Sequence, residues 1–263
     1  MNKGKLKNFN FIVGCVLIGI VFIMVLIGLF FTPFDPNGMN GSIKNLAPTL
    51  THPFGTDNFG RDILSRVMTG AKTTFFVAIT TVVIGGGFGT MLGAVTGYYG
   101  GPVDEILMRI NDALASFPSI LLALVFVSVI GPGTYNVIFA LGIIFIPSFA
   151  RVIRSEFMLL KEMDYVKNAK LMGAGDLRIM LVHILPNTKP ILLSSVTIGF
   201  NNAVLAEAGM SYLQLGVQPP DASLGRMLSE SQSFLFNAPW YALAPGIIIV
   251  MTVLGFSLVN DSV

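Results

Sequence analysis

Apolar runs separated by short polar segments follow one another along almost the whole chain. The hydrocarbon core of a bilayer is about 30 Å thick, so a helix needs roughly 20 apolar residues to cross it. Six stretches reach or approach this length, and the pattern predicts an all-α membrane protein with six transmembrane helices. The expected spans are residues 11–31, 73–99, 106–130, 137–150, 189–212 and 241–259. Six spans place both termini on the same side of the membrane.

The first apolar run could also belong to a signal peptide, because lysines precede it. It is longer than the apolar region of a signal peptide, however, and it ends in "FFTPF", where a cleavage site would need small residues. We therefore expect a retained span and keep the signal peptide as the alternative. The chain then divides into an N-terminal tail with the first span at 1–31, an extracytoplasmic polar segment at 32–70, and a core of five spans at 71–263.

Positive charge indicates which side faces the cytoplasm, because cytoplasmic loops carry an excess of Lys and Arg. With the N-terminus inside, the inner flanks hold 11 of the 16 basic residues, and the outer segments hold 5. The inner set is Lys3, Lys5, Lys7, Arg109, Arg151, Arg154, Lys161, Lys167, Lys170, Arg178 and Lys189. The outer set is Lys44, Arg61, Arg66, Lys72 and Arg226. We therefore expect both termini in the cytoplasm.

The composition excludes several functions for this chain. It is 53% hydrophobic and only 11% charged, whereas soluble domains carry about 25% charged residues, so lipid must cover part of its surface. A net charge of +2 gives no reason to expect a nucleic-acid partner. One cysteine cannot form an internal disulfide, and two histidines cannot build a histidine-rich metal cage. The chain lacks a phosphate-binding G-x-x-x-x-G-K-[ST] motif, so we expect no ATP hydrolysis, catalytic residue, cofactor or metal on it.

The second expected span carries a stripe of glycines. Gly85, Gly89, Gly93 and Gly97 recur every fourth residue and would form one bare line along a helix, where another backbone can approach closely. Ordinary helix packing within this chain explains such a stripe. The alternative is a packing face that slides during a conformational cycle.

A short polar helix is expected between the fourth and fifth spans, on the cytoplasmic side. Asp164 is the expected N-cap, Gly173 and Gly175 end the helix by adopting positive φ, and an apolar side carries Met163, Val166, Ala169 and Met172. A helix this short is marginal alone in water and needs a surface to pack on. That surface is either the lipid headgroup layer or the groove of a partner protein.

At this point the sequence resembles a known family. The segment "YVKNAKLMGAGDLRIMLVHILPN" is similar to the EAA-loop motif in the membrane subunits of binding-protein-dependent ABC importers. Further motifs resemble the dipeptide/oligopeptide/nickel permease subfamily: "HPFGTDNFGRDILSRV", "GYYGGPVDEILMRINDALASFPSILLAL", "RVIRSEF" and "EAGMSYLQLGVQPP". The resemblance covers nearly the whole chain from His52 onward.

The resemblance implies a type I ABC importer permease fold, in which the cytoplasmic helix is the coupling helix that docks on an ATPase. The residues that it assigns to this docking are Tyr165, Val166, Lys167, Asn168, Ala169, Leu171, Met172 and Gly173. It also implies two ATPase subunits that bind ATP and Mg, a second homologous permease that completes the pore, and an extracytoplasmic solute-binding protein. The expected location is a bacterial or archaeal plasma membrane. Di- or oligopeptides are the expected cargo, and nickel or a metal chelate is the alternative.

The chain departs from the family pattern at three positions. The Glu-Ala-Ala of the family is Lys167, Asn168 and Ala169 here. Lys167 cannot complete a capping box, and a cation in the first turn opposes the helix dipole. We expect it to meet an acidic edge of the ATPase instead. Gln214 stands where the subfamily usually has glycine.

Several polar residues have both a structural and a functional interpretation. Glu207 in the fifth span is either paired at a helix end or part of a gate or translocation path, because carboxylates in a membrane are costly and often functional. Glu105 and Asp112 are expected to pair with Arg109, and a contact with substrate is the alternative for Asp112. Two other classes of protein remain open: an intramembrane enzyme, for which Glu207 is the one strong titratable group, and a channel or carrier that works without partners.

Three further polar positions lie outside the expected spans. Arg61 and Asp62 are expected to order a helix along the membrane surface, with contact to a binding protein as the alternative. His52 lies in an exposed loop with no partner visible in the sequence, and His183, beside the "ILP" turn, is expected to be structural.

Overall fold

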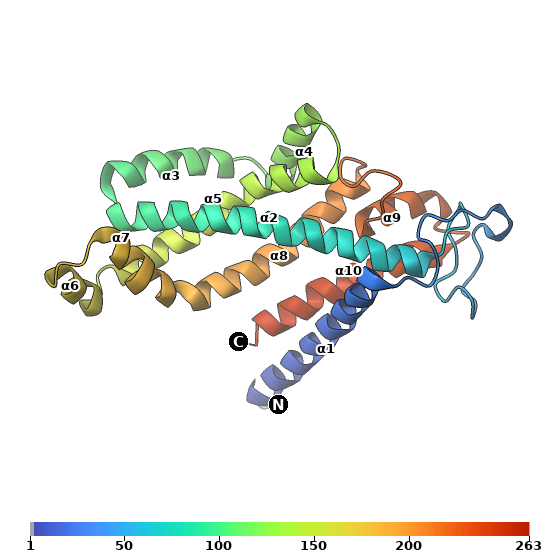
Figure 1. Ribbon diagram of the computed structural model, residues 1–263, viewed down its shortest axis with the longest axis horizontal. Helices are drawn as coiled ribbons and strands as arrows, with labels where there is room; N and C mark the ends of the chain where they lie inside the picture. Colours follow the sequence, from blue (N-terminus) through green and yellow to red (C-terminus); the bar gives the residue numbers. More distant parts are fainter. Residues whose placement is uncertain (1–2, 263) are drawn as a thin grey trace. The chain divides into compact units, whose positions relative to one another are not determined.

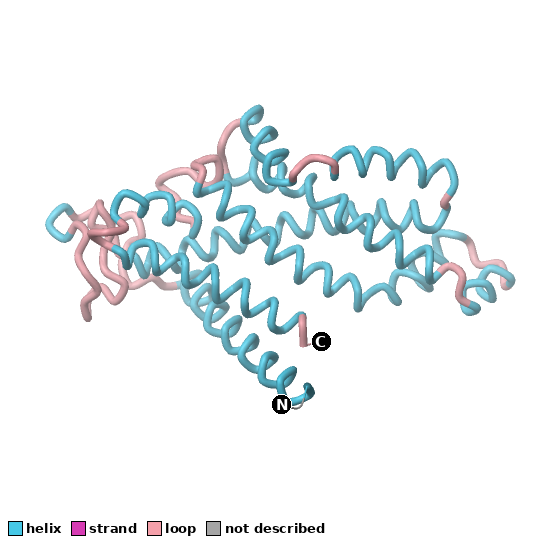
Figure 2. The backbone as a smooth tube through the Cα atoms, turned by 180° about the vertical axis from the view of Figure 1, so that it is seen from behind, coloured by secondary structure: helices cyan, strands magenta, loops and turns pink. Residues whose placement is uncertain are grey.

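The computed structural model describes residues 3–262, and the side chains of residues 8–262. Within these residues the regular elements are helices joined by loops, as Figure 2 shows, and one isolated bridge links Thr56 and Asp62. The α-helices are α1 (Lys3–Phe30), α2 (Ile63–Tyr99), α3 (Gly101–Ala115), α4 (Ser119–Ile130), α5 (Thr134–Leu160), α6 (Asp164–Leu171), α7 (Asp176–Arg178), α8 (Lys189–Tyr212), α9 (Leu224–Ser231) and α10 (Pro239–Asn260). The expected all-α class is confirmed.

Five helical segments are long and apolar enough to cross a membrane, and a bent pair brings the number to six. Four of the expected spans correspond to α1, α2, α5 and α10, and the fifth, expected at 189–212, coincides with α8. The expected single span at 106–130 is wrong as a continuous helix, because α3 and α4 meet at an angle of 85°. Pro118 lies at this break, where it has no N–H to donate and disfavours helical geometry at Phe117.

α2 and α5 extend furthest beyond the spans that the apolar pattern indicated. α2 begins at Ile63, ten residues before the expected start, and Asp62 accepts a hydrogen bond of 2.8 Å from the backbone N–H of Ser65 in its first turn. Asp62 therefore caps α2 itself rather than a separate helix. α5 continues through Pro147 to Leu160, so the arginines beyond the expected span still lie on the helix.

The chain forms two compact units, and the first contains residues 1–79, 126–138 and 200–263. In this unit α1 and α10 lie side by side, with the chain's described ends at the same end of the pair (Figures 1 and 2). A Cβ placed on Gly14 of α1 would lie 2.8 Å from the carbonyl oxygen of Gly255 on α10, so the two backbones approach closely. A core built around Ile63, Leu224 and Tyr241 joins α2, α9 and α10.

The second unit contains residues 80–125 and 139–199. The glycine stripe of α2 packs against α5 within this unit: a Cβ on Gly89 would lie 2.8 Å from the oxygen of Ile146, and one on Gly93 would lie 2.8 Å from the nitrogen of Arg154. Bare glycines let the two backbones meet, which is the packing interpretation of the stripe. The expected division of the chain into consecutive segments at residues 31 and 70 is a different kind of division from these two compact units, and it stays a prediction.

Candidate functional site

The short polar helix expected between the fourth and fifth spans is α6, and backbone conformation defines both of its ends. Its N-cap is Met163, without a side-chain hydrogen bond, and the expectation that Asp164 caps the helix is wrong by one residue. Asp164 lies instead in the first turn, where a carboxylate favours the helix dipole. At the other end Gly173 has φ +83°, as expected, whereas Gly175 has φ −70° and begins α7, so its expected role was wrong.

The C-terminus of α6 is closed by a pair of hydrogen bonds. The N–H of Gly173 donates to the oxygen of Lys170 at 3.0 Å, and the N–H of Ala174 donates to the oxygen of Ala169 at 3.0 Å. This is the Schellman arrangement, which requires a left-handed residue at the position of Gly173. The loop after α6 is therefore fixed by the local sequence.

One side of α6 packs against neighbouring helices, and apolar side chains at its C-terminal end are exposed. Val166 is 4% exposed and packs with Phe157 of α5 and with Ile179 and Ile184 of the segment that follows. Leu171 and Met172 are 85% and 88% exposed, so the chain itself covers the expected apolar side of α6 at Val166 but not at Met172. A large apolar group that water surrounds in this way commonly marks a contact surface.

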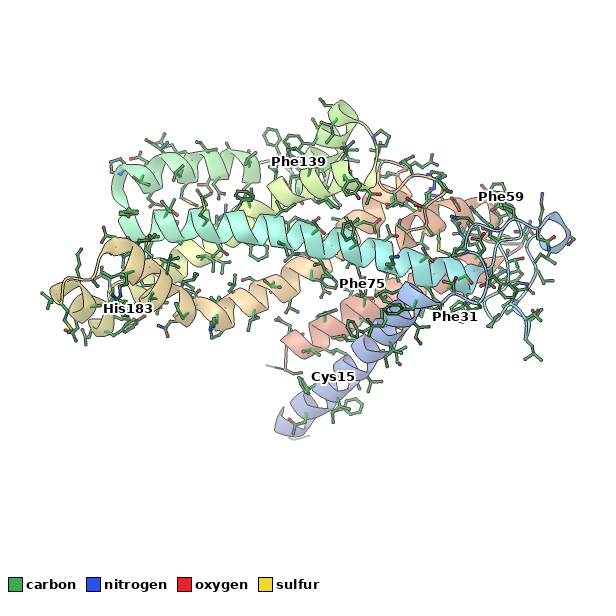
Figure 3. The ribbon with its side chains drawn as sticks, in the orientation of Figure 1. Cys15, Phe31, Phe59, Phe75, Phe139 and His183 are labelled. Carbon is green, nitrogen blue, oxygen red and sulfur yellow. The ribbon has the colours of Figure 1, made fainter. Side chains whose placement is uncertain are left out.

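The chain after α6 forms a π-helical turn, Ile179–Ile184, and a 3₁₀ turn, Leu185–Thr188. Asn187 ties these turns to α6, since its amide donates to the oxygen of His183 at 2.6 Å and to the hydroxyl of Tyr165 at 3.3 Å. Figure 3 shows His183 on this segment. Tyr165 is 40% exposed, so its ring is positioned but still accessible.

The two departures from the family pattern lie on the open side of α6. Lys167 forms an ion pair of 3.4 Å with Glu162, in which both side chains are more than half exposed. Exposed pairs of this kind contribute little to stability. Asn168 is exposed, and Ala169 is half-buried.

Ion pairs join α3 to α5 in the second unit. Arg154 holds Asp104 through two hydrogen bonds of 2.5 and 2.6 Å, and Arg151 bonds to Asp112 at 3.0 Å. The expected pairing of Asp112 with Arg109 was therefore wrong. Arg109 bonds to Glu105 at 2.9 Å, as expected, in a fully surface-exposed pair.

Glu207 is fully buried in the first unit. Ser211 donates to one carboxyl oxygen at 2.6 Å, and the hydroxyls of Thr74 and Ser223 also face the carboxyl group. Thr74 in turn accepts from the backbone of Leu224 at 3.2 Å. This network joins α2, α8 and the start of α9 around one carboxyl group.

A buried group of charges in the first unit was not foreseen. This ionic cluster consists of Asp57, Arg61, Arg66, Arg226 and Glu230. Arg61 and Arg66 bond to Glu230 at 3.0 and 3.3 Å, and Tyr241 donates to the same carboxylate at 2.8 Å. Arg61 also lies over the ring of Phe59, at 4.7 Å from the ring centre, in the segment where Figure 3 labels that ring.

Within the ionic cluster, charged partners oppose the effect of burial on Glu230 and on Arg61. Burial alone would raise the pKa of Glu230, but Arg66, Tyr241 and the other arginines lower it below its ordinary value. Burial alone would lower the pKa of Arg61, but Asp57 and Glu230 raise it. The partners lie up to 169 residues apart in the sequence, so no local pattern could indicate them. His52 also has a partner that the sequence did not indicate, because its Nδ1 lies 2.9 Å from Asp62.

Comparison with known proteins decides the family. The model of the binding-protein-dependent transport system inner membrane component matches residues 89–263, about two thirds of the chain. The chain belongs to this family. It is the membrane permease of an ABC importer, a component that is itself non-catalytic.

Curated relatives agree over most of the permease. It is 37% identical to the dipeptide transport system permease protein DppC of Haemophilus influenzae, over 97% of this chain and 88% of that protein. It is 39% identical to the glutathione transport system permease protein GsiD of Escherichia coli, over 92% of this chain and 81% of that protein. Gln214, at the position where the subfamily usually has glycine, has φ +64°, a conformation that glycine adopts without strain.

The fold of the permease matches a solved transporter. A structure of the MetNI methionine ABC transporter in an inward-facing conformation aligns with TM-score 0.58 at 20% identity, over 76% of this chain and 93% of that one. Within residues 3–262 of the permease, no group of three or more His, Cys, Asp or Glu side chains is placed to hold a metal ion.

Proposed function

We propose that this permease forms half of a peptide-importing pore and that α6 is the coupling helix through which ATPase subunits drive it. The observation that carries the proposal is the contrast along α6. Val166 is buried against α5, whereas Leu171 and Met172 present bare apolar side chains on the same short helix. A partner's groove would remove these groups from water, at roughly 1.5–3 kcal/mol for each fully buried side chain.

The contacts of α6 explain how a displacement caused by the ATPase subunits would be transmitted to the membrane helices. Val166 contacts Phe157 near the end of α5, and Asn187 joins Tyr165 to the turn that enters α8. A displacement of α6 would therefore reach both α5 and α8. ATP binding and hydrolysis on the partners would favour one of two pore conformations through their differential affinity for the permease.

The proposed assembly has two ATPase subunits, which bind ATP and Mg, a second homologous permease and an extracytoplasmic solute-binding protein. This chain would hold no cofactor itself. Both termini and α6 would lie in the cytoplasm, following the distribution of basic residues, and the segment at 32–62 would lie outside. The side chains of Lys3, Lys5 and Lys7, and residues 1, 2 and 263, lie outside the described parts of the chain. A bacterial or archaeal plasma membrane is the proposed location.

Peptides are the cargo that the comparisons favour. One relative is named for dipeptides and another for glutathione, which is a tripeptide. Glu207 enters the proposal as part of a gate, because its carboxyl group joins three elements. Since it is fully buried in this conformation, it would hold the gate together rather than touch cargo.

The test removes the bare apolar groups of α6. A permease carrying Leu171→Ser and Met172→Ser is expected to insert normally but to capture less ATPase during purification and to import less peptide. Leu50→Ser is the matched control, because Leu50 is fully exposed in the segment proposed to lie outside. Normal ATPase capture and import by the double variant would contradict the proposal.

A further inference from the structure

A pocket of about 600 Å³, with both apolar and polar side chains in its walls, lies beside the ionic cluster in the first unit. Its walls include Asn58, Arg61, Pro220, Arg226, Ser229 and Glu230. All of its lining residues lie between α1 and α2 or between α8 and α10, so none belongs to a candidate membrane span. The pocket therefore belongs to the water-facing part of the unit.

The ionic cluster beside this pocket carries surplus positive charge. Three guanidinium groups face the carboxylates of Asp57 and Glu230. The carboxylate of Asp62 bonds to Ser65 and His52 and forms no ion pair with these three arginines in the described part of the chain.

The same cluster has more donors than acceptors. One oxygen of Glu230 already accepts from Arg61, Arg66 and Tyr241, and the other accepts from Arg226. The Nε of Arg66 lies 3.7 Å from the carboxylate of Asp57 without a hydrogen bond, and Arg66 is fully buried behind the pocket wall. A carboxylate entering the pocket would supply negative charge and acceptors to an arginine in the pocket wall.

Arg226 is the residue placed to receive that carboxylate. Its Nε bonds to Glu230 at 3.1 Å, which fixes the guanidinium, and its side chain is 14% exposed in the pocket wall. Neither of its terminal amino groups bonds to another residue in the described part of the chain. A guanidinium held in this way can bind a carboxylate with two parallel hydrogen bonds.

We propose that this pocket receives an acidic side chain of the extracytoplasmic solute-binding protein and that Arg226 binds its carboxylate. The proposal rests on the sidedness and the partner given under the proposed function. A protein partner fits better than cargo in transit, because the pocket lies outside the candidate spans and offers a complementary charge to a surface that docks from outside.

The first experiment measures the affinity of the solute-binding protein for the complete transporter in nanodiscs. Arg226→Gln is expected to weaken binding about tenfold, with a smaller dependence on salt, since a charged contact is lost. Arg109→Gln removes an equal charge from a surface-exposed pair in the other unit and is expected to leave the affinity unchanged. Equal affinity for all three proteins would overturn the proposal.

A second pair of variants protects the test against misfolding. Ser229→Asp adds a negative charge to the pocket wall without removing Arg226, and Ser229→Asn is its neutral match. The acidic variant alone should weaken docking. A dipeptide probe added to the transporter without its binding protein tests whether the pocket binds cargo instead. If Arg226→Gln and Ser229→Asp both abolish binding of this probe and neither alters docking of the binding protein, the pocket binds cargo and the proposal is wrong. ATPase capture is measured in the same preparations, so a failure of the coupling role would be seen separately.

Discussion

Arg154 on α5 holds Asp104 on α3 through two hydrogen bonds of 2.5 and 2.6 Å. Both side chains are more than two thirds buried, so removing one leaves the other charge without its partner. We expect Asp104→Asn to destabilise the unit by about 1–3 kcal/mol, the range for hydrogen bonds to charged groups. Hydrogen exchange across residues 101–115 should become faster. Glu105→Gln, which removes only an exposed pair, should leave exchange unchanged, and equal behaviour of the two variants would contradict this account.

Neighbouring glycines of α2 provide a test of the packing between α2 and α5. A Cβ on Gly89 would lie 2.5 Å from the Cβ of Phe149, whereas one on Gly87 would meet nothing within 4 Å. Gly89→Val should therefore lower stability by more than the roughly 1–3 kcal/mol typical of overpacked side chains, because backbone must move. Gly87→Val should have a small effect. Thermal unfolding in detergent distinguishes them, and equal melting temperatures would show that the stripe does not pack as described.

The end of α6 offers a matched pair of backbone tests. Neither Gly173 nor Gly175 has a neighbour within 4 Å of an added Cβ, but only Gly173 has a positive φ. Gly173→Ala should strain the Schellman turn by about 1–2 kcal/mol and weaken ATPase capture, and Gly173→Asp should abolish transport without preventing insertion. Gly175→Ala should behave as wild type. Unchanged uptake by Gly173→Asp would remove the coupling role from this turn.

The hydrogen-bond network at Glu207 predicts that two substitutions of this residue differ in their effect on protein stability. Glu207→Gln keeps an acceptor for Ser211 and should fold, whereas Glu207→Ala leaves buried hydroxyls unpaired and a small cavity. We expect the alanine variant to lose several kcal/mol of stability, in the range of about 2–5 kcal/mol for large-to-small core changes. Thermal unfolding measures this loss. Normal stability of the alanine variant would mean that the carboxyl group does not hold these elements together.

The ion pairs of Glu230 with Arg61 and Arg66 predict that acid destabilises the segment between α1 and α2. Its pKa is lower in the folded protein than its ordinary value of 4.5, so its ionised form stabilises the fold. This contribution is complete above the ordinary value and is lost as the pH falls toward the lower folded pKa. Unfolding followed between pH 6 and 3 should show an acid-sensitive step that Glu230→Gln flattens. A step of the same size in the variant would assign the sensitivity to another group.

The parts of the fold that could be predicted are those set by local sequence. α8 was expected at its observed bounds, and the positive φ of Gly173 followed from helix-capping rules. The start of α2 was missed because Arg66 interrupts the apolar pattern. Arg66 is fully buried there and bonds to Glu230, a partner 164 residues away that the local pattern does not show.

Long-range partners also explain the errors in the candidate site. Asp112 bonds to Arg151, 39 residues away, instead of to its neighbour on the helix. The periodicity of α6 placed Val166 and Met172 on one side, but α5 and the π-helical turn cover only the first of them. Which part of an apolar side is covered depends on tertiary packing, and that information is absent from a spacing rule.

The most direct measurement is site-specific crosslinking from α6 in the assembled transporter. A photoreactive amino acid at Leu171, which is 85% exposed, should crosslink to an ATPase subunit, and the same group at Leu50 should not. Crosslinks from Leu171 that reach lipid alone, while peptide import by the same preparation stays normal, would contradict the claim that α6 connects this permease to the ATPases.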